Sequence, residues 1–438
     1  MNQFTLLKTK RFFPIFATQF LGALNDNIYK NSLVIFIAFA LADQAGGNSS
    51  ILVITAAGIF ILPFFLFSAL SGQIADKYEK SMLIRRIKIA EIVIMSMAAC
   101  GFVFLSLPLL MFVLFLMGTQ STLFGPLKYG ILPQHLQESE LIGGNGMVQM
   151  GTYLAILLGT ILGGILIAMK PEGRYFVSLL VIFVACLGWL ASRQIPQAAP
   201  YDAGLQVSWN FIKETIIIVR FARENMIVYW SIIAISWFWF YGATFLSLIP
   251  SYTKDILSGN EGITTILLTA FSVGIGTGSL MCEKFSKKQI EMGLVPLGAA
   301  GLTLFAVDLF IVGIPVHNGF EITAMEFLRH FNNWRVLFDL CLIGFSGGIY
   351  IVPLYAMIQN LSSATHRSRI MAANNILNAL FMVLSALLTI LLFTMHITIP
   401  QMFMISAALN VMVVGYVFLR VPGFMQRVVV IMGLKPSQ

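Results

Sequence analysis

The sequence predicts an all-α membrane protein in which twelve transmembrane helices form two pseudo-symmetric six-helix halves. Of the 438 residues, 58% are hydrophobic and 11% are charged, whereas a soluble protein carries about 25% charged residues. Apolar runs of roughly 20 residues, the length that crosses a bilayer, recur along the chain. Short motifs of the first half also recur in the second half, which indicates an internal repeat.

The predicted membrane spans fall into two sets of six. The N-terminal half (1–195) contains 12–41, 51–75, 84–106, 108–133, 144–169 and 174–195. The C-terminal half (226–438) contains 226–250, 262–283, 291–315, 334–360, 368–394 and 399–420. The linker 196–225 connects the two halves. It begins with two prolines and continues with apolar and basic residues, a composition typical of an amphipathic helix on the cytoplasmic membrane surface.

The net charge of +8 indicates membrane orientation and not nucleic-acid binding, because the basic residues lie in short loops between apolar runs. With the N-terminus inside, the cytoplasmic segments hold 20 of the 27 Lys and Arg residues and the outside loops hold 5. Both termini are therefore expected in the cytoplasm. The first apolar run is too long for a cleavable signal peptide. No cofactor or metal site is predicted, because the four cysteines show no ligand spacing.

The first span carries a polar stretch, residues 19–32, in the middle of its apolar run. Asp26 and Lys30 are four residues apart, so they share a helix face and can form an ion pair. Asn27 lies beside them. One interpretation is an internal pair that only holds helices together. The favoured one is a face that lines a watery pathway for a polar substrate, since ionisable groups inside membranes usually mark such pathways.

Two sets of motifs carry the repeat. Pro126-Leu-Lys-Tyr129 precedes Gly143-Gly-Asn145, and Pro353-Leu-Tyr-Ala356 precedes Ala372-Ala-Asn374 in the same way. Two related halves that enclose a central site are the plan of a secondary transporter.

A candidate gate lies between the second and third spans. The stretch from Gly72 through Asp76 and Lys77 to Lys80 resembles the loop signature of the major facilitator superfamily, with Glu79 in place of its second glycine. Gly72 would allow close helix contact, and Asp76 would lie at the N-terminus of a neighbouring helix, where the dipole favours an anion. The alternative is an ordinary charged loop. The second copy keeps Gly278 but has Cys282 for the acid, so the gate would be asymmetric.

Longer stretches carry a more specific resemblance. Residues 19–27, 124–136, 143–145, 347–356 and 372–383 resemble the bacterial lysophospholipid transporter (flippase) family, especially the transporter part of acyltransferase fusions. The resemblance implies that lysophospholipids, such as lysophosphatidylethanolamine, move from the outer to the inner leaflet of the bacterial inner membrane by alternating access. It also implies a separate acyltransferase as a partner. A monomer is expected.

Other functions stay open as alternatives. One is a major facilitator carrier of a soluble compound such as a siderophore or drug, and another is an uncoupled lipid scramblase. An enzyme is not expected, because none of the five histidines is followed by aspartate at the fifth position, as a glycerolipid acyltransferase would require.

The remaining candidates for substrate binding are spread over several spans. Lys128, which follows Pro126, would either contact the lipid phosphate or extend to the membrane surface. The aromatic residues near the centre of the seventh span would line an acyl chain or simply pack against lipid. The amides of the eleventh span would bind a headgroup or bond neighbouring helices. The full set of these candidates is Lys128, Tyr129, Gln149, Tyr153, Trp237, Trp239, Tyr355, Asn374, Asn375 and Asn378.

Charged residues nearer the outside are expected to be structural or gating. Asp308 and Asp339 lie toward the outer ends of their spans. Glu321, Glu326 and Arg329 fall in an outside loop that is expected to contain a short surface helix.

Overall fold

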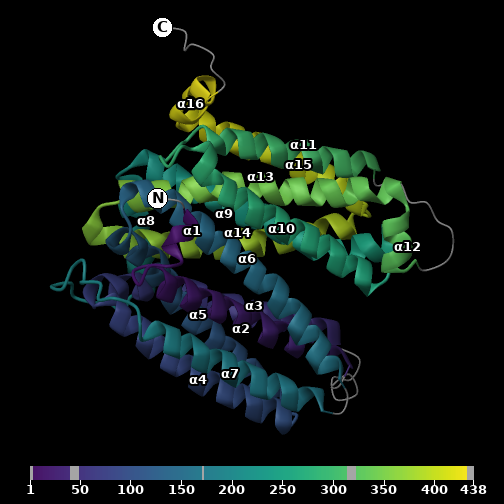
Figure 1. The fold of residues 1–438 in the computed structure, drawn as a ribbon, viewed down its shortest axis with the longest axis horizontal. Helices are drawn as coiled ribbons and strands as arrows, with labels where there is room; N and C mark the ends of the chain where they lie inside the picture. Colours follow the sequence, from purple (N-terminus) through teal and green to yellow (C-terminus); the bar gives the residue numbers. More distant parts are fainter. Residues whose placement is uncertain (1–2, 40–48, 170–171, 313–321, 432–438) are drawn as a thin grey trace. The chain divides into compact units, whose positions relative to one another are not determined.

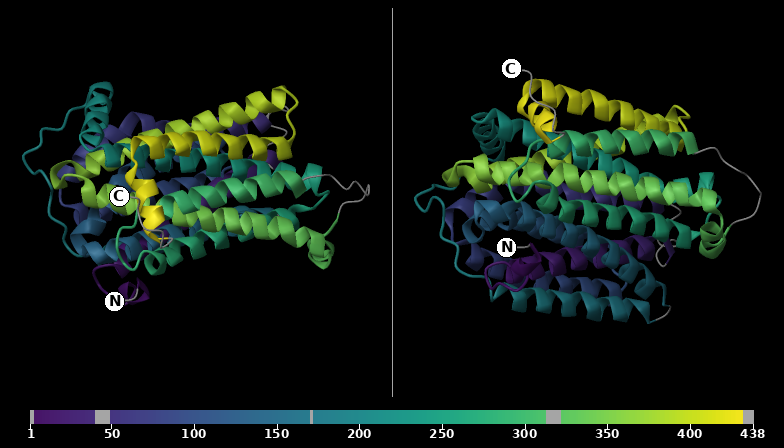
Figure 2. Two further views of the ribbon diagram at one scale, coloured as in Figure 1. Left: turned by 90° about the horizontal axis from the view of Figure 1, so that it is seen from above. Right: turned by 45° about the horizontal axis from the view of Figure 1, so that its top comes forward.

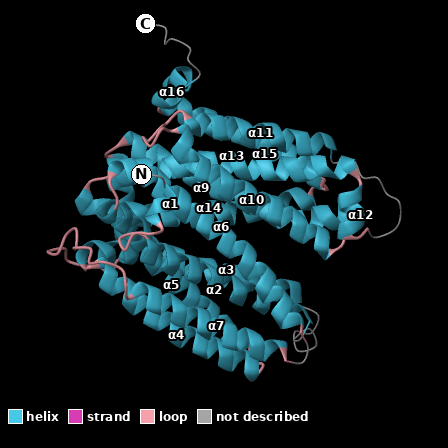
Figure 3. Cartoon of the chain, viewed as in Figure 1, coloured by secondary structure: helices cyan, strands magenta, loops and turns pink. Residues whose placement is uncertain are grey.

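The computed structural model describes residues 3–39, 49–169, 172–312 and 322–431. These residues form helices joined by loops, with no strand of a sheet among them (Figure 3). Lys170 and Glu321 lie outside the described residues. The first half contains α1 (Gln3–Leu6), α2 (Phe13–Phe39), α3 (Ser49–Lys77), α4 (Lys80–Val103), α5 (Leu107–His135), α6 (Glu138–Ala168) and α7 (Gly173–Ser192).

The linker helix α8 (Phe211–Arg223) leads to the second half. This half contains α9 (Met226–Ser251) with the π-turn η1 (Tyr252–Ile256), α10 (Glu261–Phe285), α11 (Leu294–Val312), α12 (Ala324–Arg329) and α13 (Phe331–Leu361). The turn η2 (Ala364–His366), α14 (Arg367–Thr394), α15 (Ile399–Arg420) and α16 (Gly423–Ile431) complete it (Figure 1).

The twelve predicted spans are confirmed as long helices. The largest difference at a start is in α6, which begins at Glu138 and not at 144. Among the described residues, ten helices are long and apolar enough to cross a membrane. The other two long helices, α2 and α4, carry the polar and charged residues described below, which lowers their hydropathy. Lys88 lies within α4 (Lys80–Val103), in agreement with the predicted span 84–106.

The described residues divide into two compact units. Unit 1 comprises Met1–Gln137, Leu154–Glu224 and Ser362–Ile376. Unit 2 comprises Glu138–Tyr153, Asn225–Leu361 and Leu377–Gln438. Two helices, α6 and α14, therefore contribute one end to each unit. This division differs from the contiguous halves 1–195 and 226–438 in those two helices, and the contiguous domain assignment stays a prediction.

In unit 1, α4 packs against α7 and α5, while α3 packs against α5 and α2 against α7. The core between α2 and α4 is aromatic: the Tyr29 and Phe102 rings meet edge to face at 5.6 Å. The Tyr29 hydroxyl donates to the Leu110 carbonyl at 2.7 Å, which satisfies the one polar atom of this buried side chain.

The C-terminal part of α6 packs closely on α2. A Cβ at Gly159 would lie 2.7 Å from the Leu24 carbonyl oxygen, so only glycine allows this approach. Asn31 donates to Thr160 Oγ1 at 3.1 Å, and Ser32 donates to the Gly163 carbonyl at 3.0 Å. Small residues that bring backbones together, with polar bonds across the interface, are the usual way that membrane helices associate.

Unit 2 is built around α13, which packs against α10, α11 and α9, while α15 packs against α11 and α9. Both views of Figure 2 show α11, α13 and α15 running side by side. Glycines again permit close contact: a Cβ at Gly348 of α13 would lie 2.6 Å from the Ile275 carbonyl oxygen of α10. The Cys282 thiol lies in this interface and donates to carbonyls of α10 and α13.

The linker contains the predicted amphipathic helix. Asn210 caps α8 by accepting from the Lys213 amide at 3.0 Å. Ile218 and Ala222 are buried, and Ile218 packs with Ala69 of α3 and Ala372 of α14. The helix exposes the basic residues Lys213, Arg220 and Arg223 together with Phe211, Ile212 and Ile216. It thus combines buried apolar residues with exposed basic and apolar ones, and a membrane-surface location stays a prediction.

The short helix expected in the outside loop between the ninth and tenth spans is α12. The Thr323 side chain and the Glu326 carboxylate form a capping box at its start. Glu326 and Arg329 both lie in this helix.

Candidate functional site

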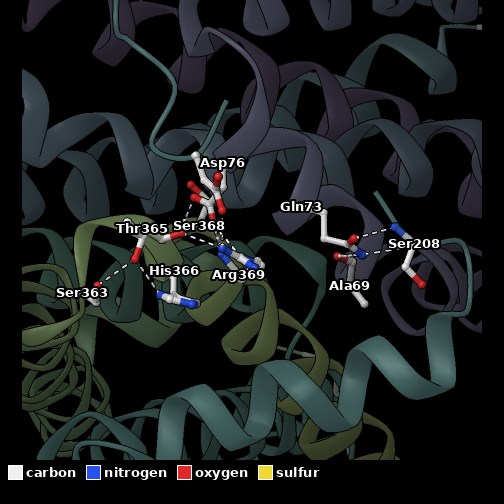
Figure 4. Close-up of polar contacts among 10 residues, drawn as sticks. Ala69, Gln73, Asp76, Ser208, Ser363, Thr365, His366, Ser368 and Arg369 are labelled. Atoms are coloured by element: carbon white, nitrogen blue, oxygen red, sulfur yellow. Dashed lines mark hydrogen bonds and ion pairs between the residues drawn. The ribbon is translucent and has the colours of Figure 1, made fainter. Parts of the chain in front are cut away.

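Asp76, at the end of α3, contacts the first turn of α14 (Figure 4). Its carboxylate accepts from the Ser368 amide at 3.0 Å and the Arg369 amide at 3.3 Å. Arg369 Nε lies 3.1 Å from Asp76 Oδ2, and both side chains are buried. These amides have no partner within the helix, and the dipole favours an anion here. The expected position of Asp76 at a helix N-terminus is confirmed, and its gating role stays a prediction. We call this set the gate contact: Asp76, Ser368 and Arg369.

Gly72 is one turn before Asp76 on the same face of α3. A Cβ at this position would lie 2.8 Å from Arg369 Cα and 2.8 Å from Ala372 Cβ. The glycine is therefore required for the approach of α3 to α14 in unit 1. Gly278 is not its structural equivalent, because it faces the backbone of Phe345 on α13.

The two lysines of the gate signature lie over tyrosine rings outside α14. Lys77 Nζ lies over the ring of the adjacent Tyr78 at 5.6 Å. Lys80 is buried, and its Nζ lies 3.6 Å from the centre of the Tyr201 ring in the linker. Lys80 also donates to the Ala199 carbonyl at 3.4 Å. Lys80 therefore contacts the linker, a partner that the loop signature did not indicate.

Glu79, which replaces the second glycine of the signature, caps α4 through the amides of Ser81 and Met82. It also accepts from the Ala198 amide of the linker at 2.7 Å. Burial alone would raise the pKa of the Glu79 carboxyl, but these hydrogen bonds hold it below its usual value. From the sequence, Glu79 was noted only as a departure from the signature, and because glutamate is not among the preferred N-cap residues, no local signal indicated this role.

On α2, the Asp26 carboxylate contacts α5 and not Lys30. Ser121 Oγ donates to Asp26 Oδ2 at 2.8 Å, and Asp26 Oδ1 is buried without a hydrogen-bond partner. Lys30 Nζ lies over the Phe60 ring at 4.5 Å. The structure does not bring the two charges to ion-pair distance, so the expectation of a direct Asp26–Lys30 pair is wrong. Helical spacing places Asp26 and Lys30 on one face of α2, but the Asp26 side chain bonds to α5 and the Lys30 side chain lies against α3.

Asn27 bonds within its own helix. Its amide donates to the Ala23 carbonyl at 2.7 Å. This intrahelical bond is the local contact that asparagine commonly forms in helices, and it leaves the proposed substrate contact of Asn27 untested.

An ion pair that sequence reasoning missed lies beside Asp26 in unit 1. Lys88 Nζ and Glu91 Oε2 of α4 are 2.5 Å apart and fully buried. Asn25 donates to Glu91 Oε1 at 3.1 Å, and Gln120 donates to Glu91 Oε2 at 3.0 Å. A Cβ at Gly22 would lie 2.5 Å from Lys88 Nζ, so this glycine makes room for the ammonium group. The i,i+3 spacing of opposite charges in an apolar run was the available signal.

Lys128 and Tyr129 lie on α5 in unit 1. Lys128 is half-buried, and its Nζ lies over the Tyr129 ring at 4.6 Å. No carboxylate among the described residues lies within ion-pair distance of Lys128. Asn375 Nδ2 lies against Gly125, three residues before Lys128 on α5. This buried nitrogen also has no hydrogen-bond acceptor in the described part of the chain. One turn of α5 thus has two donors without acceptors beside it.

Unit 2 contains the remaining candidates except Asn374, which is fully buried in unit 1. Gln149, Tyr153 and Tyr355 are buried. Nearby, Asn145 of α6 and Gln359 of α13 exchange amide hydrogen bonds of 2.6 Å and 3.1 Å. This amide pair was not predicted, and only the approach of the two helices reveals it.

The aromatic residues of α9 face inward. Trp237 is 4% exposed, and its Nε1 donates to Asn410 Oδ1 at 2.7 Å. Trp239 is half-buried. Asn378 accepts from Ser236 at 2.9 Å. These bonds exclude simple packing of Trp237 against lipid, and they show that Asn378 joins α14 to α9.

The acids toward the outer ends of their spans form one group in unit 2. Arg335 forms a bidentate pair with Asp308, and the side chains are partly exposed. Asp339 is buried. The structural or gating role expected for Asp308 and Asp339 stays a prediction.

Comparison with known proteins identifies similar chains. The family model described as Major Facilitator Superfamily matches residues 15–380. The lysophospholipid transporter LplT of Serratia proteamaculans (strain 568) is 24% identical over 367 residues, which cover 81% of each chain. The protein of the same name from Escherichia coli (strain SE11) is 27% identical over 363 residues, again 81% of each chain.

Two solved structures share the fold. The human organic anion transporter MFSD10 (TETRAN) has a TM-score of 0.70 and 13% identity, and the match covers 93% of this chain and 99% of that one. A variant of the E. coli fucose:proton symporter FucP has a TM-score of 0.65 and 14% identity, with 93% and 97% covered. At these identities the likeness concerns the fold alone.

Proposed function

Because this chain belongs to the major facilitator superfamily, we propose that it transports lysophospholipids, such as lysophosphatidylethanolamine, across the bacterial inner membrane. The proposed direction is from the outer to the inner leaflet, by alternating access, with a separate acyltransferase that uses the delivered lipid. The names of the relatives, at 24–27% identity over four fifths of each chain, support this substrate class.

The observation that carries the proposal is a pair of donors without acceptors, Lys128 on α5 and Asn375 on α14, which both lie beside the turn of α5 from Gly125 to Lys128. The Lys128 ammonium has no counter-ion, and Asn375 Nδ2 has no acceptor, among the described residues. Charged groups in membrane helices are unfavourable without a partner, and buried donors normally have one. A phosphate group would satisfy both, since lysine binds phosphate as a point charge.

Asp26 would supply the complementary charge. Its Oδ1 is buried without a partner, and its Oδ2 is fixed by Ser121 of α5. Ser121 lies seven residues before Lys128, so both lie on one side of α5, roughly 10 Å apart along the axis. A zwitterionic headgroup carries an anion and a cation, and it would therefore match the Lys128 and Asp26 groups.

The energetics suit a lipid substrate. The acyl chain is already in a membrane, so transport does not require a large apolar affinity in the protein. The polar headgroup, by contrast, would need replacement of its hydration by protein groups. Gln149, Tyr153, Tyr355, Trp239 and Asn374 remain proposed contacts that assist this replacement, and Trp237 and Asn378 would act from their bonded positions.

The proposal is tested with purified protein in vesicles. Labelled lysophosphatidylethanolamine is added to the outside, and albumin extracts the fraction that stays in the outer leaflet. We expect time-dependent protection from albumin that exceeds that of empty vesicles. A rate equal to that of empty vesicles would refute lysophospholipid transport.

Imposed ion gradients separate the alternatives in the same assay. Equal rates in both directions, independent of any gradient, would identify a scramblase. Uptake of a soluble compound, such as a siderophore or drug, without lipid movement would identify a major facilitator carrier of soluble compounds. Protection of a diacyl phospholipid at the same rate would exclude selectivity for the lysophospholipid.

A further inference from the structure

The first part of the linker bonds to α4 and to α14 within unit 1. We propose that Tyr201 and Asp202 are positioning residues of the gate, and that they stabilise the contact of Asp76 with the first turn of α14. We call Ala198, Ala199, Tyr201 and Asp202 the linker clasp.

One side of the linker clasp is attached to the segment between α3 and α4. Ala198 donates to the Glu79 carboxylate at 2.7 Å and accepts from the Lys80 amide at 3.1 Å. The Asp202 amide donates to the Asp76 carbonyl at 2.9 Å. Hydrogen bonds to charged groups are about twice as strong as neutral ones. The bond to Glu79 therefore anchors this side.

The other side of the linker clasp contacts α14. Arg367 Nη1 donates to the Tyr201 hydroxyl at 2.9 Å, and that hydroxyl donates to the Gly130 carbonyl of α5 at 2.9 Å. Burial raises the pKa of Tyr201, so its hydroxyl keeps the proton that it donates. Arg369 Nη2 lies 3.5 Å from Asp202 Oδ2.

Arg369 joins the linker clasp to the gate contact. It bonds Asp76 through Nε at 3.1 Å and pairs with Asp202 through Nη2 at 3.5 Å. The Tyr201 ring also supports Lys80, whose Nζ lies 3.6 Å from its centre. Movement of the first turn of α14 away from Asp76 would break the Arg367–Tyr201 and Arg369–Asp202 contacts together.

Interactions that exist in one conformation only shift the population toward that conformation. The bonds of Ala198 to Glu79 and Lys80 do not involve α14, so they are independent of the gate contact. The bonds of Tyr201 and Asp202 to Arg367 and Arg369 do depend on it. The linker thus has bonds at Ala198 that do not involve α14, and bonds of Tyr201 and Asp202 to α14 that form only when α14 is in contact with Asp76. Such an arrangement stabilises one conformation of the gate.

A separate pair of bonds holds the later part of the linker. Gln73 of α3 and Ser208 exchange bonds of 3.2 Å and 2.8 Å (Figure 4). This attachment does not involve α14 either. Loss of Tyr201 or Asp202 contacts therefore should not release the whole linker from unit 1.

Hydrogen–deuterium exchange of the full chain in nanodiscs tests the inference. The variants are Tyr201→Phe, which keeps the ring beneath Lys80 and removes the hydroxyl, and Asp202→Asn, which removes the charge. We expect amides of 364–372 to exchange about tenfold faster in each variant, the scale of one lost charge-assisted hydrogen bond, while amides of 79–82 and 208–212 keep their rates. Arg367 also donates to the Ser362 carbonyl at 3.3 Å and lies over the Tyr201 ring, so Tyr201→Phe combined with Arg367→Gln should raise exchange at 364–372 above that of Tyr201→Phe alone.

The matched control is Tyr175→Phe. Among the described residues, the hydroxyl of this exposed tyrosine accepts a hydrogen bond only from the adjacent Arg174, at 2.9 Å, and removal of the hydroxyl should leave exchange at 364–372 unchanged. Unchanged exchange at 364–372 in both clasp variants would overturn the inference. An equal increase across the whole chain would also overturn it, since that result indicates general destabilisation.

The inference rests on the proposed function only in assuming that the gate contact opens during transport. Exchange reports the contact itself, and the vesicle assay reports lipid movement. If the wild-type protein moves no lysophospholipid while exchange at 364–372 rises in the Tyr201 and Asp202 variants, the proposed substrate is wrong and the role of the linker clasp is supported. If the wild-type protein transports lysophospholipid and exchange at 364–372 does not change in the variants, the proposed role of the linker clasp is wrong.

Discussion

Lys88 Nζ lies 2.5 Å from Glu91 Oε2, one turn apart on α4, with both side chains shielded from solvent. The side-chain amides of Asn25 and Gln120 donate to the same carboxylate. The four groups form a buried polar cluster in unit 1. Removal of one charge would leave the other buried without compensation, which is strongly destabilising.

Glu91→Gln should therefore destabilise the protein by about 3–5 kcal/mol. The double variant Lys88→Met with Glu91→Gln should recover most of this loss, because no isolated charge remains. Thermal unfolding of the purified protein measures both. Arg335→Gln is the control, since it breaks a partly exposed pair with Asp308 and should change stability far less than Glu91→Gln does. Equal losses in the single and double variants would contradict this account of the pair.

Asp26→Asn should leave expression unchanged and reduce lysophospholipid transport at least about tenfold, equivalent to ~1.4 kcal/mol. Asparagine retains an oxygen that can accept from Ser121, so the α2–α5 contact survives while the charge is lost. The vesicle assay measures the effect. Asp255→Asn, at an exposed acid, should have no effect. Wild-type transport by Asp26→Asn would remove Asp26 from the mechanism.

Lys128→Ala should weaken lysophospholipid binding without preventing assembly. A charge-assisted contact contributes about 1.5–3 kcal/mol, or roughly 10- to 150-fold in affinity. Lys128→Arg should retain part of the affinity, because charge and reach survive although geometry differs. Binding to purified protein in nanodiscs gives the comparison, with Lys254→Ala as an exposed control.

A lysine that extends to the membrane surface leads to a different result. Alanine would then be tolerated, since a surface charge contributes little. A change below about threefold in affinity, with intact folding, would move Lys128 from the substrate site to the structural residues. Asn375→Ala combined with Lys128→Ala should show non-additive losses if both donors bind one phosphate.

Gly72→Ala should weaken the gate contact. The added Cβ would lie 2.8 Å from Arg369 Cα, so α14 must shift away from α3. Gly58→Ala in the same helix is the matched control, because nothing lies within 4 Å of its Cβ position. At such an open helix site, alanine is favoured over glycine by about 1 kcal/mol. Hydrogen exchange at 368–372 should rise in Gly72→Ala alone, and equal exchange in both variants would contradict the close-approach argument.

The orientation of the chain is checked with reporters. Fusions after Gln438 and within the linker near Asp202 should report the cytoplasm, and an insertion near Gly319 should report the periplasm. The excess of basic residues in the assigned cytoplasmic segments predicts this result. A periplasmic signal from the linker would contradict the orientation.

The twelve spans, the linker helix and the short helix α12 could all be predicted from the sequence. Each of these elements depends on the length and polarity of one continuous stretch of residues, so the local sequence is sufficient to predict it. The sequence also predicted that Asp76 would lie at the N-terminus of a neighbouring helix, because a carboxylate is favoured at any helix N-terminus. The sequence did not identify that helix as α14.

The tertiary structure alone decided the partners of the polar side chains. Asp26 bonds Ser121 and not Lys30, Trp237 bonds Asn410, and Glu79 holds Ala198. Each partner lies on another helix or in the linker, from 95 to 173 positions away along the chain. Helical periodicity shows which residues share a face, but it does not show which faces meet. That choice follows from the close packing of whole helices at glycines such as Gly72 and Gly159, where a missing side chain lets two backbones approach.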